Sequence, residues 1–168
     1  MQLIEINKAR YRRHLNLVIL GCICGLVIGS LVISQTLIGL FPDKSGSHFN
    51  WNLLGVVTAS VTIAWLLNKY RTHDFMTEVV YVWDLKQSLN KINRRMLKLK
   101  AASLEGNANA ILALQYSYAG SRLLWQLDDN TIVMDELAMQ QAELDKIAVE
   151  YNLTLNIDDY DERTLKQF

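Results

Sequence analysis

The sequence contains a single proline and only two cysteines, and its 17 basic side chains are balanced by 17 acidic ones. Two cysteines cannot form a disulfide framework, and both Cys22 and Cys24 fall inside an apolar run. The balanced charge argues against a dedicated nucleic-acid-binding protein, which normally carries a basic excess. The chain also lacks a phosphate-binding loop, a glycine-rich dinucleotide turn, an HExxH zinc motif and a paired CxxC motif. We therefore expect no metal, no cofactor, no catalytic residues and no nucleic-acid partner.

Formal charge is missing from two long stretches in the first half of the chain. Residues 15–42 form 28 consecutive uncharged positions, and residues 49–68 form 20. A helix that spans a membrane needs about 20 predominantly apolar residues, so both stretches are predicted to be membrane spans. Neither contains Asp, Glu, Lys, Arg or His, which argues against a transporter or an ion pathway.

Each span has one alternative interpretation. A cleaved signal peptide also places basic residues before an apolar run, but that run is usually about 7–15 residues long and ends at a small-x-small site, which is missing here. The second stretch contains Thr58, Ser60 and Thr62 and could be a buried helix of a soluble domain. However, the rest of the chain is too small to bury it. Trp51 and Trp65 also bracket it, as aromatic residues do at membrane interfaces.

Basic residues flank the two spans on the side away from the turn that joins them. Short segments rich in Lys and Arg stay in the cytoplasm, whereas the turn carries only Lys44. We therefore predict that both termini face the cytoplasm and that the turn lies outside. The flanking residues are Lys8, Arg10, Arg12 and Arg13 before the first span, and Lys69 and Arg71 after the second.

Small residues recur at every fourth position of both spans. The first span has Gly21, Gly25 and Gly29, and the second has Gly55 and Ala59. This spacing lets two membrane helices approach closely. The approaching helix is either the second span of the same chain or the first span of another copy. The short turn already holds the two spans together, which favours packing within the chain.

Residues 71–168 are predicted to be helical. A long segment without Gly or Pro carries apolar residues in alternating steps of three and four, the coiled-coil spacing of a helix that packs on a helical partner. Glu105-Gly106-Asn107 and Asp128-Asp129-Asn130 are predicted to separate successive helices, because such residues end helices and cap the next. The predicted helices cover residues 75–104, with Asp74 as a possible N-cap, then 108–127 and about 131–151.

The last apolar segment, residues 153–157, alternates like a strand. It either pairs with residues 3–6 or lies extended, and the pattern does not decide between the two.

The first of these helices carries six basic residues and no acid between Lys86 and Lys100. One interpretation places this basic face on anionic lipid headgroups, at roughly 1 kcal/mol per basic residue. The other pairs it within the bundle with the acidic third helix, and we favour this pairing. The basic residues are Lys86, Lys91, Arg94, Arg95, Lys98 and Lys100.

Three segments of the sequence also resemble a known family. They are Asn52-Leu53-Leu54-Gly55-Val56, the stretch from Thr72-His73-Asp74-Phe75 to Trp83-Asp84-Leu85-Lys86, and Leu127-Asp128-Asp129-Asn130. In these segments the chain resembles the bacterial, mainly gammaproteobacterial, membrane-protein family called domain of unknown function 3087. The resemblance covers nearly the whole chain and implies an inner-membrane location. It implies no activity and no catalytic residues.

We therefore expect an all-α protein in which a two-helix transmembrane hairpin precedes a cytoplasmic bundle of about three helices. Its expected function is structural: an oligomerising scaffold or accessory subunit that contacts the lipid bilayer and either another copy or another membrane protein. The alternative is a membrane-anchored ligand sensor or enzyme with an aromatic pocket in the bundle, although helical aromatic residues usually belong to a core. The expected segments are a basic N-terminal tail (1–14), two spans (15–41 and 51–70), a periplasmic turn (42–50) and a cytoplasmic domain (71–168).

Overall fold

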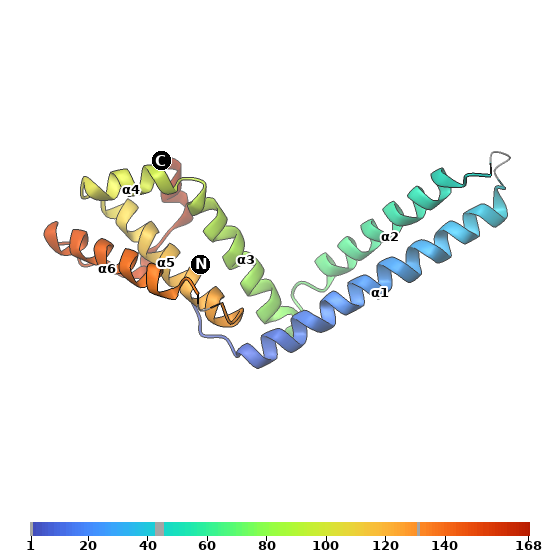
Figure 1. Ribbon diagram of the computed structural model, residues 1–168, viewed down its shortest axis with the longest axis horizontal. Helices are drawn as coiled ribbons and strands as arrows, with labels where there is room; N and C mark the ends of the chain where they lie inside the picture. Colours follow the sequence, from blue (N-terminus) through green and yellow to red (C-terminus); the bar gives the residue numbers. More distant parts are fainter. Residues whose placement is uncertain (1, 43–45, 131) are drawn as a thin grey trace. The chain divides into compact units, whose positions relative to one another are not determined.

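A computed structural model describes residues 2–42, 46–130 and 132–168. Within these residues it contains six α-helices and three short 3-10 helices and no strand (Figure 1). The chain divides into two compact units. The hairpin unit is Asn7–Val80, and the bundle unit combines residues 2–6 with Tyr81–Phe168. The predicted all-α class is confirmed for the described residues.

Two long antiparallel helices make up most of the hairpin unit (Figure 1). Helix α1 covers Lys8–Leu40 and α2 covers Phe49–Lys69, and both are long and apolar enough to cross a membrane. In the most apolar window of each helix only 6% and 11% of the residues are buried, unlike the core helix of a soluble protein. Most of their apolar side chains are therefore exposed rather than packed in a core.

The start of α1 differs from the expected basic tail. Asn7 accepts a hydrogen bond from the backbone N–H of Arg10 (3.0 Å), so it caps a helix that already begins at Lys8. The predicted basic flank is therefore helical, and the 33 residues of α1 extend over about 50 Å. At the other end, Lys44 of the expected turn lies outside the described residues.

After α2 the chain forms the 3-10 helix η1, Asp74–Met76, and then α3, Thr77–Asn93. The expected N-cap Asp74 is wrong. The imidazole Nδ1 of His73 accepts from the N–H of Phe75 (3.1 Å), and Asp74 is the first residue of η1.

The bundle unit is built around α5, Ala108–Leu127, which contacts α4, α6 and the 3-10 helix η2. Ile111, Leu114 and Tyr116 of this helix are at most 1% exposed. Its predicted bounds are confirmed, because Gly106 adopts a left-handed φ of 77° and Asn107 accepts from the N–H of Ala110 (3.2 Å). The remaining elements are α4 (Met96–Leu104), α6 (Met134–Glu150), η2 (Ile157–Asp159) and η3 (Glu162–Gln167).

The predicted continuous helix over 75–104 is wrong, because it breaks at Arg94 and Arg95 into α3 and α4. The heptad pattern is obeyed on both sides of the break, since Ile92 and Leu99 are fully buried while Leu97 is 86% exposed. No Gly or Pro causes the break. We attribute it to the packing of α4 on α5, since tertiary contacts override the propensity of a locally uninterrupted helix. The bundle unit thus holds residues of four α-helices rather than about three.

Two further expectations concern the C-terminal part of the chain, and the first of them is corrected. Helix α6 begins at Met134 without a side-chain cap, because Asp129 adopts a left-handed φ of 55° and residues 132–133 form a turn; Thr131 lies outside the described residues. Of the two alternatives for residues 153–157, pairing as a strand is not seen, and residues 153–156 lie extended before η2 starts at Ile157. Their alternation instead places Leu153, Leu155 and Ile157 on the half-buried side of an extended segment.

Candidate functional site

Among the glycines of α1 and α2, Gly55 is the most tightly enclosed. A Cβ atom on this glycine would overlap the hydroxyl of Ser34 and lie 2.8 Å from the carbonyl oxygen of Ser30. Gly55 and Ser34 are both buried, although most residues of the two helices are exposed. Only glycine allows the two backbones to come this close at this position.

The glycines of α1 pack less tightly and not all in the same way. A Cβ on Gly29 would make an ordinary contact with the Cβ of Ala59 (3.5 Å), and one on Gly25 would contact Ile63 Cδ1 (3.6 Å). A Cβ on Gly21 would meet nothing within 4 Å. The two helices therefore diverge from Gly55 toward Gly21, and the stripe packs within the chain at two of its three glycines.

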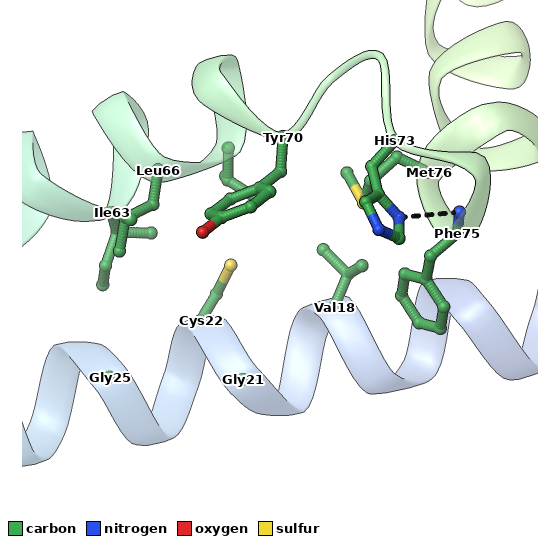
Figure 2. Close-up of a pocket in the computed structure, with 11 residues that line it drawn as sticks. Val18, Gly21, Cys22, Gly25, Ile63, Leu66, Tyr70, His73, Phe75 and Met76 are labelled. Carbon is green, nitrogen blue, oxygen red and sulfur yellow. Dashed lines mark hydrogen bonds between the residues drawn. The ribbon is translucent and has the colours of Figure 1, made fainter.

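An apolar pocket of about 400 Å³ lies where the two helices diverge (Figure 2). On the side of α1 the lining includes Gly21 and Gly25, which contribute no side chains and so leave space. The other walls come from the end of α2 and from η1. Figure 2 shows His73 at the end of the pocket that is remote from Gly25, beside Phe75, whereas the ring of Tyr70 lies between this end and Leu66. The lining residues are Val18, Gly21, Cys22, Gly25, Ile63, Leu66, Leu67, Tyr70, His73, Phe75 and Met76.

A polar cluster adjoins this pocket at Phe75. The ring of His14 stacks on that of Phe75, with centroids 4.1 Å apart. Glu78 Oε1 lies 2.8 Å from Arg10 Nε, and Glu78 Oε2 lies 3.4 Å from His14 Nδ1. The His14 and Glu78 side chains are only 15% and 14% exposed, so this contact ties the start of α1 to the start of α3. No group of three His, Cys, Asp or Glu side chains suited to a metal occurs among the residues that the structure describes.

The other flanking residues lie at the two ends of the hairpin. Lys69 Nζ lies 5.0 Å from the ring centroid of Trp65 and 5.8 Å from that of Tyr70. At the opposite end, Trp51 stacks on Phe41, with centroids 5.6 Å apart. The predicted topology residues Lys8, Arg12 and Arg13 occupy the first turns of α1, and Arg71 follows α2.

The basic face of α3 and α4 is partly paired within the bundle unit, but not with the expected partner. Lys86 Nζ lies 3.6 Å from Asp128 Oδ2, just after α5, and Lys91 Nζ lies 2.6 Å from Glu162 Oε1 in η3. Lys98 Nζ donates to the carbonyl oxygen of Phe168 (2.7 Å). The expected pairing with the acidic third helix, α6, is therefore wrong, because η3 lies on this face instead. Arg94, Arg95 and Lys100 form no ion pair with any described acid.

Two aromatic residues of the bundle unit pack against each other in its core. Tyr116 and Tyr160 are buried and stacked, with ring centroids 4.2 Å apart. Trp83 is 62% exposed, which contradicts a core role for it. A pocket that includes Tyr118 has a volume of only about 160 Å³, below the roughly 300–1,000 Å³ of small-molecule sites.

Burial perturbs the ionisation of the two stacked tyrosines. It raises the pKa of Tyr116 above its ordinary value of 10.0. It raises the pKa of Tyr160 as well, with a further contribution from the nearby Glu162 carboxylate. Both effects disfavour the tyrosinate form in the folded chain.

Sequence reasoning missed several of these residues. The pocket depends on Tyr70, His73 and Met76, which the sequence showed only as residues near a membrane edge. Gly21 was a usable signal for the pocket. It is the third glycine of the stripe in the first span, whereas the second span offers only Gly55 and Ala59 as matching small residues. The hydroxyl of Tyr81 was also missed: it accepts from Ile4 N–H (2.8 Å) and donates to the carbonyl of Gln2 (3.2 Å).

A protein-family model described as "Protein of unknown function (DUF3087)" matches residues 1–165. The chain belongs to this family. The match extends over the hairpin unit and nearly all of the bundle unit, so the resemblance seen in three short segments is confirmed over essentially the whole chain. Comparison with curated proteins and with solved structures found no match.

The contact at Gly55 predicts a graded response to alanine substitutions. Gly55→Ala is expected to lower the stability of the hairpin by about 1–3 kcal/mol, because its methyl group must displace Ser34. Gly39→Ala is the matched control, since a Cβ there meets nothing within 4 Å. Thermal unfolding and limited proteolysis of the detergent-solubilised chain measure the difference. Equal unfolding midpoints for the two variants would refute the close contact.

The buried tyrosines predict alkaline destabilisation. Because their folded-state pKa values lie above 10.0, the folded chain binds more protons than the unfolded chain at higher pH. Their contribution to stability is complete below pH 10 and is lost as the pH rises toward the folded-state values. Tyr160→Phe is expected to move alkaline unfolding, followed by helical circular dichroism and tyrosinate absorbance, to higher pH. An unchanged alkaline transition in this variant would contradict the assignment.

Proposed function

We propose that this protein is a membrane-anchored interaction protein, a scaffold or accessory subunit. Its hairpin unit crosses the inner membrane of a bacterium twice, and its bundle unit presents a cytoplasmic surface to another copy or to another membrane protein. The proposal assigns no catalytic activity and no cofactor.

Membrane anchoring is supported by the outward-facing apolar side chains of α1 and α2 and by their flanks. The aromatic ring of Trp65 beside Lys69 is typical of a membrane interface. Residues before α1 and residues after α2 also meet in one compact unit, through Ile4 and Tyr81. Because the two ends of the hairpin join in one folded unit, this contact supports two crossings with both termini on the same side of the membrane.

The interaction role is supported by one observation: the bundle unit has a filled core but leaves large apolar side chains exposed. Leu85, Leu99 and Ile111 are fully buried, whereas Leu97 and Ile132 are 86% and 91% exposed. Scattered exposed apolar residues are ordinary, but side chains of this size on several elements favour a binding surface over an enzyme site. Further exposed residues of this kind are Trp83, Leu104, Met139 and Val149.

The alternative, a ligand sensor or enzyme with an aromatic pocket in the bundle, is not favoured by these contacts. Tyr116 stacks on Tyr160 instead of lining a cavity, and the pocket at Tyr118 is small. A membrane-anchored enzyme would also need a nucleophile, a base or a metal in mutual reach. The cluster at His14 and Glu78 contains an ion pair of Glu78 with Arg10, and His73 caps η1.

Reporter fusions test the proposed topology. A periplasm-active reporter fused after Phe168 is expected to be silent, and one inserted after Ser47 is expected to be active, because basic flanks stay in the cytoplasm. A cytoplasm-active reporter at the same two sites serves as the control and should give the opposite pattern. Activity of the periplasmic reporter at Phe168 would refute the orientation.

Affinity purification in mild detergent with mass spectrometry tests the interaction role. The double substitution Ile132→Gln and Met139→Gln is expected to reduce recovery of a specific co-purifying partner by about tenfold, since it removes exposed apolar contacts. Gln126→Ser changes an exposed polar residue and is the matched control. Circular dichroism verifies that both variants remain helical. Identical co-purifying proteins for the double variant and the wild type would argue against this surface.

A further inference from the structure

The pocket between α1, α2 and η1 has the chemistry of a lipid site. Its walls are mostly apolar side chains, and the imidazole of His73 lies at one end, beside Phe75 and Met76 (Figure 2). A ligand that fits this arrangement has a hydrocarbon chain and a polar group at one terminus. With about 400 Å³, the pocket is at the small end of ligand sites and has room for one chain.

The imidazole of His73 is oriented to donate a hydrogen bond at that end. Its Nδ1 accepts from the N–H of Phe75 (3.1 Å), so the proton of the neutral ring resides on Nε2. The ring therefore offers an N–H donor beside an apolar pocket, which suits a phosphate oxygen. The ring of His14 stacks on Phe75, a lining residue next to His73, and so supports the pocket wall at this end.

The charge at this end of the hairpin unit favours an anion. The first turns of α1 and residues 69–78 contain six Lys and Arg against two acids, Asp74 and Glu78. One of the two acids, Glu78, is already paired with Arg10 (2.8 Å). Lys69 lies beside Tyr70, a lining residue (5.8 Å from its ring centroid). A phosphate at His73 would therefore lie in a region of net positive charge.

We propose that this pocket binds one acyl chain of an anionic phospholipid, with the lipid phosphate held by His73 and the neighbouring cations. The proposal goes beyond the interaction role and rests on membrane insertion of the hairpin. Gly21 is the residue that makes it possible: a side chain at this position would enter the pocket, and a Cβ there meets nothing within 4 Å. Gly21 would thus serve the lipid alone, whereas Gly29 packs against Ala59 and Gly25 both packs against Ile63 and lines the pocket.

Native mass spectrometry of the full chain in a nonionic detergent tests this proposal. The chain is titrated with phosphatidylglycerol and, in parallel, with phosphatidylcholine of the same acyl chains. The wild type is expected to retain one phosphatidylglycerol at least about tenfold more tightly than phosphatidylcholine. Equal retention of the two lipids would overturn the proposal, and so would release of an uncharged prenyl lipid, and no phospholipid, from protein purified out of native membranes.

Two variants separate the acyl chain from the phosphate. Gly21→Leu fills the pocket and is expected to weaken phosphatidylglycerol retention by about tenfold, whereas Gly39→Leu, equally open but outside the pocket, should leave it unchanged. His73→Asp keeps an acceptor for the Phe75 N–H but replaces the donor with a negative charge, so it should abolish the preference for phosphatidylglycerol. Unchanged retention in Gly21→Leu, or an unchanged preference in His73→Asp, would refute the site.

Two controls make each outcome interpretable. Circular dichroism and the monomer mass verify that the variants are folded, and a dimer that excludes lipid would identify the occupant as a second copy and overturn the proposal. Alkaline carbonate extraction of the membranes tests insertion separately. Protein that resists extraction but shows no lipid preference contradicts the lipid site alone, whereas extracted protein contradicts the membrane anchoring on which it rests.

Discussion

The backbone approach of α1 and α2 at Gly55 is the constraint on which the hairpin unit depends. In a lipid environment two apolar helices gain little from burying carbon, so close packing and weak polar contacts must hold them together. The overlap that any side chain at Gly55 would have with Ser34 shows how short this approach is. From this point the helices diverge past Gly29 and Gly25, and the space left at Gly21 becomes the apolar pocket. Packing and cavity are two consequences of one crossing geometry.

Much of the fold follows from local sequence signals. Absence of charge indicated the apolar helices, and Gly106 with Asn107 defined the start of α5, because a left-handed residue and a side-chain cap act within one turn of chain. The break at Arg94 and Arg95 was not predictable, since we attribute it to the packing of α4 on α5 and no Gly or Pro marks it locally. Ser34 as the partner of Gly55 was equally hidden, because serine was not included among the small residues of the first span.

The basic face of α3 and α4 shows that a run of like charges in the sequence does not identify the partner of each side chain. Six basic residues on one segment suggested either lipid or an acidic helix, yet Lys91 and Lys98 bind η3 and the last residue of the chain. Exposed ion pairs of this kind contribute about 0–1 kcal/mol each, so they orient the last segment more than they stabilise it. Burial of Tyr160 and Leu165 supplies the larger part of that docking. The segment is a structural part of the bundle, although its composition resembles a solvated acidic tail.

The hydrogen bond between Ile4 and the hydroxyl of Tyr81 joins positions 77 residues apart, with both long helices between them. A ribosome makes the first of these residues early and the second only after the complete hairpin. During synthesis the N-terminal segment therefore has no docking site until α3 emerges, and the bundle unit cannot close before both apolar helices have left the ribosome. Contacts of such high sequence separation form late and slowly. Assembly is consequently vectorial: the hairpin is made first, and the unit that contains both ends of the chain is completed last.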